Sequence, residues 1–142
     1  MIEHGITGSV ARLMTRDPLV VSQEAPLMDA AELMDTFDIT GLPVVDDTGA
    51  VVGVISQTDL VRAATTRHLW GGWPGLSVRH LMTSPAITVR PETALDEAAR
   101  LMERERIHRL VVVGEDGRTP VGVLSLSDFV RMLAEDGEGE GV

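Results

Sequence analysis

The spacing of hydrophobic residues along the chain changes in a fixed order, and that order occurs twice. Two short β-branched runs, 19–21 and 87–89, follow a proline and are typical of edge strands. Apolar stripes at helical spacing come next, over residues 27–37 and 95–102. Two strand-like runs and a second amphipathic helix end each set. The predicted order is strand, helix, strand, strand, helix, which indicates an α/β or α+β fold.

The two sets are copies of one unit. GVISQTDLVRA begins at Gly53 and returns at Gly122 as GVLSLSDFVRM, and the other segments match at a separation of 68 or 69 positions. Short copies bury little surface alone, so we expect them to pack about a pseudo-twofold axis with a cleft between them. The predicted division is repeat one at 10–64, a linker at 65–77, repeat two at 78–134 and a flexible acidic tail at 135–142.

Composition narrows the class of protein. The chain is 44% hydrophobic with only two Trp and two Phe, so the core is expected to be aliphatic, with Met14, Met34, Met82 and Met102 inside it. A net charge of −10 disfavours binding to nucleic acid or to an anionic membrane. The N-terminus lacks the pattern of a signal peptide and no apolar run is long enough to span a bilayer. We therefore expect a soluble cytoplasmic protein.

The end of each copy carries the candidate chemistry. Residues 56–59 (SQTD) and 125–128 (SLSD) both fit a capping box at the start of a helix. Such a cap stabilises the helix, and this alone could explain the motif. Gly53 and Gly122 leave room for something to approach the strand closely. A second hydroxyl, from Thr58 or Ser127, adds a donor at a helix N-terminus, where anions are favoured. Structural cap and ligand site both stay open on these residues.

These motifs resemble the CBS domain, named after cystathionine beta-synthase, and two copies over residues 10–134 resemble the tandem pair called a Bateman module. The resemblance implies a regulatory module that binds an adenosine-containing ligand in the clefts between copies. It further implies that Asp59 and Asp128 accept ribose hydroxyls, with Thr58 and Ser127 as their hydroxyl partners. Around the base it places Thr83, Pro85, Ala86 and Ile87, with Leu19 and Val20 as their counterparts from copy one.

The copies differ where a phosphate would be held. His108 and Arg109 precede the third predicted strand of copy two, and copy one has Thr40-Gly41 there. Arg109 either clamps a phosphate, with His108 beside it, or belongs to an exposed helix end where it pairs with Glu105. We expect unequal sites. On the first alternative, Asp128→Ala should cost more nucleotide affinity than Asp59→Ala.

Three further features concern the helices and the linker. Arg62 and Arg131 recur in the closing helices and either form a salt bridge to an acid of the facing copy or face solvent. Thr93 is expected to be the N-cap of its helix. The segment with Trp70 and Trp73 is a linker that covers the core or a dimer contact, or else a docking patch or lid.

Catalysis finds no support in the sequence. Nucleophile, phosphate-loop and zinc-protease motifs are absent, and the four histidines lack metal-ligand spacing, so no enzyme, metal or required cofactor is predicted. Two hypotheses remain. The first is a module that senses AMP, ADP, ATP or S-adenosylmethionine and changes the arrangement of a homodimer or of an unidentified target protein. The second is a ligand-independent dimerisation and interaction scaffold.

Overall fold

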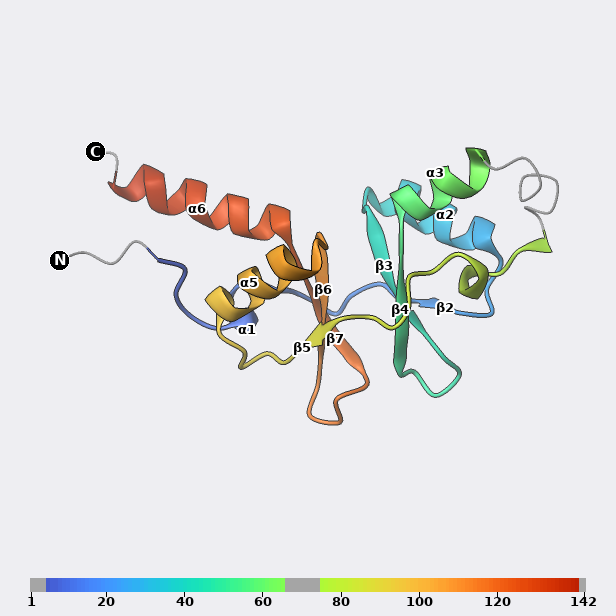
Figure 1. The fold of residues 1–142 in the computed structure, drawn as a ribbon, viewed down its shortest axis with the longest axis horizontal. Coiled ribbons are helices and arrows are strands. Elements are labelled where there is room, and N and C mark those ends of the chain that lie inside the picture. Colours follow the sequence, from blue (N-terminus) through green and yellow to red (C-terminus); the bar gives the residue numbers. More distant parts are fainter. Residues whose placement is uncertain (1–4, 66–74, 141–142) are drawn as a thin grey trace. The chain divides into compact units, whose positions relative to one another are not determined.

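The chain folds into two compact units in a computed structural model, which describes residues 5–65 and 75–140 (Figure 1). One unit is continuous, Pro18–Ile87, and the other joins Met1–Asp17 to Thr88–Val142. We call them the continuous unit and the composite unit. Trp70 and Trp73, with most of the predicted linker, lie outside the described residues.

The continuous unit holds a three-stranded sheet of order β2-β3-β4, in which β2 is parallel to β3 and β3 is antiparallel to β4. Buried aliphatic residues from both helices and the sheet form its core. Its elements are β2 (Val21–Ser22), α2 (Leu27–Phe37), β3 (Gly41–Val45), β4 (Val51–Ser56), α3 (Gln57–Thr65) and the 3-10 turn η2 (Val78–His80).

The composite unit repeats this plan with one strand more. Its sheet has the order β1-β7-β6-β5, and the short β5 lies at an edge, as β2 does in the other sheet. The predicted order of strand, helix, strand, strand, helix is therefore confirmed in both copies. The elements are α1 (Val10–Leu13), β1 (Thr15–Arg16), β5 (Thr88–Val89), α5 (Leu95–Glu105), β6 (Arg109–Val113), β7 (Pro120–Ser125) and α6 (Leu126–Glu140).

The predicted helical stripes form the buried faces of α2 and α5, with one exception. Leu27 and Leu95, which begin the two helices, have no exposed surface. Of the later stripe residues, Ala30, Met34, Ala98 and Met102 are buried, and Ala31 and Ala99 are half-buried. Phe37 was expected on the same stripe but is 54% exposed. At about 100° per residue, Phe37 lies ten residues after Leu27 and is therefore turned about 80° away from it around the helix axis. Its side chain consequently leaves the core-facing side. Three of the four paired methionines are buried, and Met82 is partly buried and packs against the core.

The segment before each copy's first strand packs on the other copy, and we call these two the exchanged segments. β1 pairs antiparallel with β7, and the Val10 amide donates to the Thr93 carbonyl over 2.8 Å. In the continuous unit, Val54 and Thr83 exchange two backbone hydrogen bonds of 3.0 and 2.8 Å. Sequence analysis missed both pairings because each joins a residue of one sequence repeat to a residue of the other. The compact units therefore cut across the sequence repeats.

These exchanged segments also cap α2 and α5, the first helix of each predicted strand-helix-strand-strand-helix set. The Leu95 amide donates to the Gly8 carbonyl over 2.9 Å, and the Leu27 amide to the Leu76 carbonyl over 2.8 Å. Thr93 is therefore not the N-cap that the sequence suggested: its hydroxyl accepts from the Arg90 amide instead. Backbone carbonyls from another segment satisfy the N–H groups that a side chain would otherwise cap.

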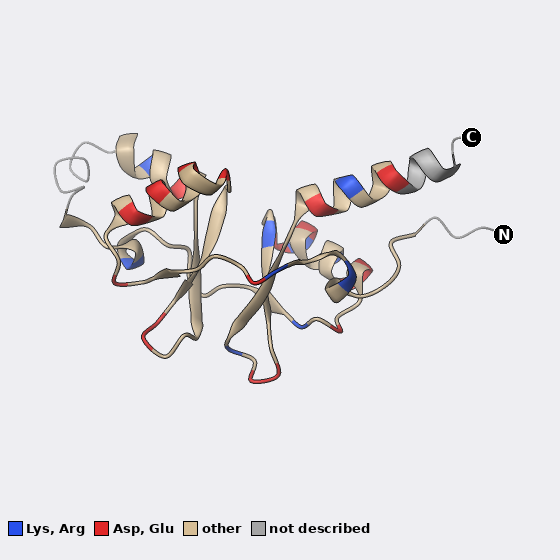
Figure 2. Ribbon diagram, turned by 180° about the vertical axis from the view of Figure 1, so that it is seen from behind, with Lys and Arg blue, Asp and Glu red and all other residues tan. Residues whose placement is uncertain are grey.

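The acidic C-terminus differs from its prediction too. α6 extends to Glu140, so most of the segment expected to be a flexible tail is helical. No proline interrupts the chain after the capped start, and the glutamates favour the helix, whereas Gly137 and Gly139 disfavour it. Acidic residues recur along the helices and at the tips of the two hairpins (Figure 2).

Candidate functional site

The first candidate site is the corner where β4 turns into α3, residues 56–59, called here the first corner. Asp59 is only 9% exposed. Its Oδ2 accepts hydrogen bonds from the amide of Ser56 over 2.9 Å and from the hydroxyl of Ser56 over 3.0 Å. The Ser56 hydroxyl in turn accepts from the Asp59 amide over 3.2 Å. The capping box predicted from the sequence is therefore present, and it turns the carboxylate inward.

The second corner, residues 125–128, joins β7 to α6 in the same way. Asp128 is 5% exposed, and its Oδ2 accepts from the amide and hydroxyl of Ser125 over 2.8 and 3.0 Å. Here the second hydroxyl is also engaged, because the Oγ atoms of Ser125 and Ser127 lie 2.8 Å apart. No hydrogen bond joins the equivalent Thr58 hydroxyl to any other residue in the described part of the chain.

The other carboxylate oxygen distinguishes the corners. Arg131 Nη2 donates to Oδ1 of Asp128 over 2.9 Å. At the first corner, Arg62 Nη1 lies 3.9 Å from Oδ1 of Asp59, an ion-pair distance that is too long for a hydrogen bond. Each arginine thus pairs with an acid of its own helix at i,i+3 spacing. A salt bridge to an acid of the facing copy, one of the two alternatives from the sequence, stays a prediction.

The glycine before each corner admits the protein's own chain. A Cβ on Gly53 would lie 2.7 Å from the carbonyl oxygen of Thr83 and 2.9 Å from the sulfur of Met82. On Gly122 it would lie 2.8 Å from the sulfur of Met14. The close approach predicted from these glycines is real, but the exchanged segment occupies the space. The two glycines consequently carry no argument for a ligand.

The residues expected around the base gather in one unit. All six belong to the continuous unit, and Thr83 pairs with the strand that leads to Asp59. Leu19 and Val20 are 39% and 40% exposed, Pro85 is exposed, and the last two predicted residues, Ala86 and Ile87, are half-buried. The structure thus places these residues in the unit of Asp59. Their contact with a base, and the cleft between the copies, stay predictions.

His108 and Arg109 lie beside the second corner. Arg109 is the first residue of β6 and faces Ser125 in the strand register, and the Leu126 amide donates to the His108 carbonyl over 2.9 Å. The alternative of an exposed helix end is wrong, because α5 ends at Glu105. Glu105 lies 3.7 Å from Arg104, its neighbour in the sequence. The role of Arg109 as a phosphate clamp stays a prediction.

A shallow groove runs along α3 from the first corner. Its volume is about 510 Å³, and the residues that line it are Gln57, Thr58, Val61, Arg62 and Thr65. Sequence analysis named only Thr58 as a ligand residue and left out Gln57, Val61 and Thr65. The i,i+4 spacing of Gln57, Val61 and Thr65, on the side of α3 away from the core, could have identified them. Asp59 is not among the lining residues, so the groove adjoins the first corner without reaching the carboxylate.

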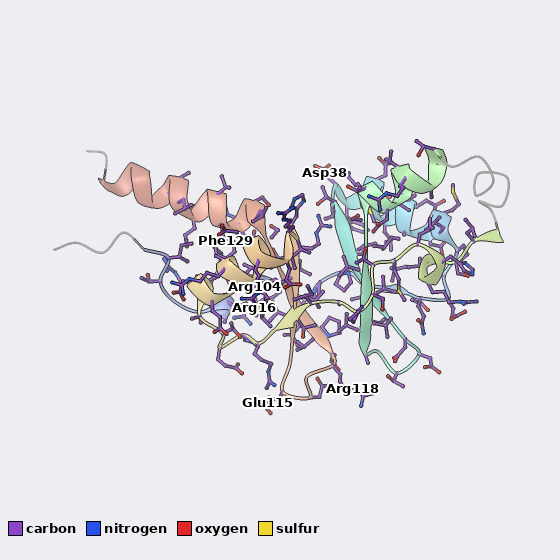
Figure 3. The ribbon with its side chains drawn as sticks, viewed as in Figure 1. Arg16, Asp38, Arg104, Glu115, Arg118 and Phe129 are labelled. Carbon is purple, nitrogen blue, oxygen red and sulfur yellow. The ribbon has the colours of Figure 1, made fainter. Side chains whose placement is uncertain are left out.

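The hairpin tips are built as structural turns. Asp116 in the β6–β7 hairpin, whose tip carries Glu115 and Arg118 (Figure 3), accepts hydrogen bonds from the Thr119 hydroxyl and from the amides of Thr119 and Arg118. These bonds lower the pKa of Asp116 to about 2, the Thr119 hydroxyl contributing most. Within residues 5–65 and 75–140, no cluster of three or more His, Asp or Glu is placed to hold a metal ion. No helix in these ranges has the length and apolar character to cross a membrane.

Two known proteins are similar to this chain in sequence. The chain is 35% identical over 122 residues to the gamma-3 subunit of 5'-AMP-activated protein kinase from Sus scrofa, covering 83% of this chain and 24% of that subunit. It is 33% identical over 119 residues to inosine-5'-monophosphate dehydrogenase from Bifidobacterium longum, covering 83% of this chain and 21% of the enzyme. The chain thus spans less than a quarter of the length of either relative.

Solved structures agree. The structure of CBSX2 from Arabidopsis thaliana in complex with AMP matches with a TM-score of 0.77 and 35% identity, covering 89% of this chain and 96% of that chain. The CBS domain pair of protein MJ0100 in complex with 5'-methylthioadenosine and S-adenosyl-L-methionine matches with a TM-score of 0.82 and 25% identity, covering 92% and 98%. The family model of the CBS domain matches residues 10–65 and 78–135. With both copies matched in sequence and fold, the chain belongs to the CBS domain family as a tandem pair.

Proposed function

We propose that this chain is a regulatory module that binds the ribose of an adenosine-containing ligand at the first corner. The observation that carries the proposal is the state of Asp59: the carboxylate is 9% exposed, and its Oδ1 has no hydrogen bond from its ion-pair partner, Arg62. Thr58, its neighbour in the sequence, lines the groove along α3, where the rest of a ligand could lie. The complexes of CBSX2 with AMP and of MJ0100 with S-adenosyl-L-methionine support adenosine as the shared part of the ligand.

A carboxylate suits a ribose because it accepts and never donates when ionised. Two vicinal hydroxyls can both donate to Oδ1 of Asp59 without disturbing the bonds that Oδ2 accepts from Ser56. Charge-assisted hydrogen bonds of this kind contribute about 1.5–3 kcal/mol each. Such contacts select a sugar rather than a bare phosphate.

This choice reverses the order that the sequence favoured. Arg109 pointed to Asp128 as the more important acid, and it does lie in the same unit. However, Oδ1 of Asp128 already accepts a hydrogen bond from Arg131, and Ser127 is bonded to Ser125. The acid with fewer existing partners is the better acceptor. Arg109 and His108 remain the proposed cations for a phosphate.

The regulatory part of the proposal concerns assembly. We expect the chain to act without catalysis of its own, as a homodimer or bound to an unidentified target protein. A ligand changes such an arrangement only when it binds two arrangements with different affinity. AMP, ADP, ATP and S-adenosylmethionine are the ligand candidates.

A thermal-shift panel with these four compounds and adenosine tests the proposal. A ligand at 100 times its dissociation constant adds about 2.7 kcal/mol to the free energy of unfolding, a readily measured rise in Tm. We expect at least one compound to raise the Tm of the unmodified chain, and the Asp59→Asn variant to lose most of that rise. No shift with any compound at millimolar concentration contradicts ligand binding.

A ligand-independent scaffold is the second candidate. The capping boxes favour it, because both aspartates already stabilise a helix start by accepting hydrogen bonds from Ser56 and Ser125. On this alternative, none of the compounds changes the Tm, and the oligomeric state depends on protein concentration alone. Sedimentation with and without AMP separates the two candidates.

A further inference from the structure

We infer that Arg131 is an autoinhibitory latch that closes the second corner to a ribose; the inference rests on the proposed function. The side chain is 57% exposed, yet its Nη2 donates to Oδ1 of an acid whose side chain is only 8% exposed. The matching arginine of the first corner, Arg62, stays 3.9 Å from its acid. Two corners of the same design thus differ in whether an arginine closes the acid.

Acceptor capacity makes this difference important. An ionised carboxylate offers about four lone-pair sites, two on each oxygen. In both corners a serine amide and hydroxyl fill the two sites on Oδ2. At Asp59 no residue in the described ranges donates a hydrogen bond to Oδ1, which leaves both of its sites for two ribose hydroxyls. At Asp128 the bond from Arg131 takes one of them, so a second vicinal hydroxyl finds no acceptor until the arginine moves.

The second hydroxyl of the corner strengthens the closure. Ser127 shares a hydrogen bond with Ser125, which itself bonds to Asp128, so these three side chains and Arg131 form one connected network. A ligand that enters here must break two bonds, whereas at the first corner no described residue bonds the Thr58 hydroxyl. Because Ser127 and Arg131 are exposed, each of these bonds adds only a modest cost to ligand entry.

Removing the latch should create a second site. Asp59→Asn in the unmodified background disables the first corner and leaves weak binding of adenosine or AMP. Adding Arg131→Gln to that variant should strengthen binding about three- to tenfold, the range expected when one half-exposed competing ion pair is removed. The control, Arg100→Gln added to Asp59→Asn, removes an exposed arginine that pairs with Asp96 on α5, and it should leave affinity unchanged. Titration calorimetry with adenosine and with AMP measures all three.

The outcomes separate the latch from the proposed function. Equal or weaker binding after Arg131→Gln overturns the latch, and weaker binding of AMP alone would instead assign Arg131 to a phosphate. Loss of the gain when Asp128→Asn is added confirms that it arises at the second corner. Urea unfolding of each variant shows whether it is folded. If the unmodified chain and every variant fail to bind adenosine and AMP, both proposals fall; if only the gain is missing, the latch alone falls.

Discussion

The two compact units follow one plan, yet they differ in how each is assembled and in how each aspartate is used. Backbone bonds from Val10 to Thr93 and from Val78 to Ala25 recur at equivalent places, as do the capping boxes. At the corners the symmetry ends, because Arg131 bonds to Asp128 while Arg62 stays farther from Asp59.

This difference teaches that a duplicated motif does not imply duplicated function. The capping box is needed for stability in each unit, so the same serine and aspartate persist whether or not a ligand binds. What distinguishes a site from a structural turn is the acceptor capacity left after the local bonds are made. In this chain the two aspartates differ in that capacity because Arg131, one turn along α6, bonds to Asp128, while Arg62, one turn along α3, stays farther from Asp59.

The largest expected effect is a loss of stability in one unit only, caused by a charged residue in an exchanged segment. Val10 lies in repeat one of the sequence but has no exposed surface and packs in the composite unit. Val10→Asp buries an unpaired charge and should cost more than about 3 kcal/mol of unfolding free energy. Hydrogen exchange should show lost protection in β6 and β7 and little change in β3 and β4.

Val130→Asp is the matched control, because Val130 is in the same unit and 65% exposed. Its unfolding free energy should stay within about 0.5 kcal/mol of the unmodified value. Loss of protection in β3 and β4 rather than in β6 and β7 after Val10→Asp would contradict the exchanged assembly.

The second prediction sharpens the contrast between the acids. Asp59→Asn should weaken binding of the adenosine ligand by about 100-fold, since two charge-assisted hydrogen bonds of roughly 1.5 kcal/mol or more are lost. Asp128→Asn, its matched control, should weaken binding by less than about threefold, the scale of one exposed ion pair. Calorimetry measures both, and a larger loss with Asp128→Asn would move the site to the second corner.

The third prediction compares the glycines. Gly53→Ala puts a Cβ 2.7 Å from a backbone oxygen of Thr83, whereas the nearest atom at Gly122 is the flexible sulfur of Met14 at 2.8 Å. Overpacking against backbone should cost about 1–3 kcal/mol, and Gly122→Ala should cost less because a methionine end can move. Urea denaturation checks the order, and equal losses would show that the backbone of Thr15, 3.0 Å away, matters as much.

The smallest expected effect is the pH dependence that Asp116 contributes. Its pKa is lowered from 3.8 to about 2 in the folded chain, so its contribution is present above the unfolded pKa. That contribution is lost as the pH falls from about 4 to about 2. Asp116→Asn should flatten this part of the curve of stability against pH slightly, because the carboxylate is exposed. An unchanged curve would show that the Thr119 bonds do not persist in solution.

The sequence predicted the elements well because local patterns determine them. Period and breaker residues located α2, α5 and both hairpins, and the SxxD spacing identified both capping boxes. Phe37 and Thr93 were misassigned because each lies at a helix end, where the direction of the departing chain and the backbone of a distant segment decide burial and capping.

The site was predicted only in part. The motif placed Asp59, Thr58, Asp128 and Ser127 at the helix starts, where the structure has them. Which acid keeps an open oxygen could not be deduced from it, since Arg62 and Arg131 occupy the same position of the repeat and differ only in the conformations they adopt.

By itself, the sequence determined that two copies of one strand-helix-strand-strand-helix unit exist and that a capped carboxylate begins each closing helix, because hydrophobic period and capping chemistry act over a few residues. Only the tertiary structure decided that each unit is completed by the segment preceding the other copy, and that the two carboxylates are unequally engaged. Contacts between residues far apart in the chain, and the rotamers of long arginines, depend on the whole packed unit rather than on any local pattern.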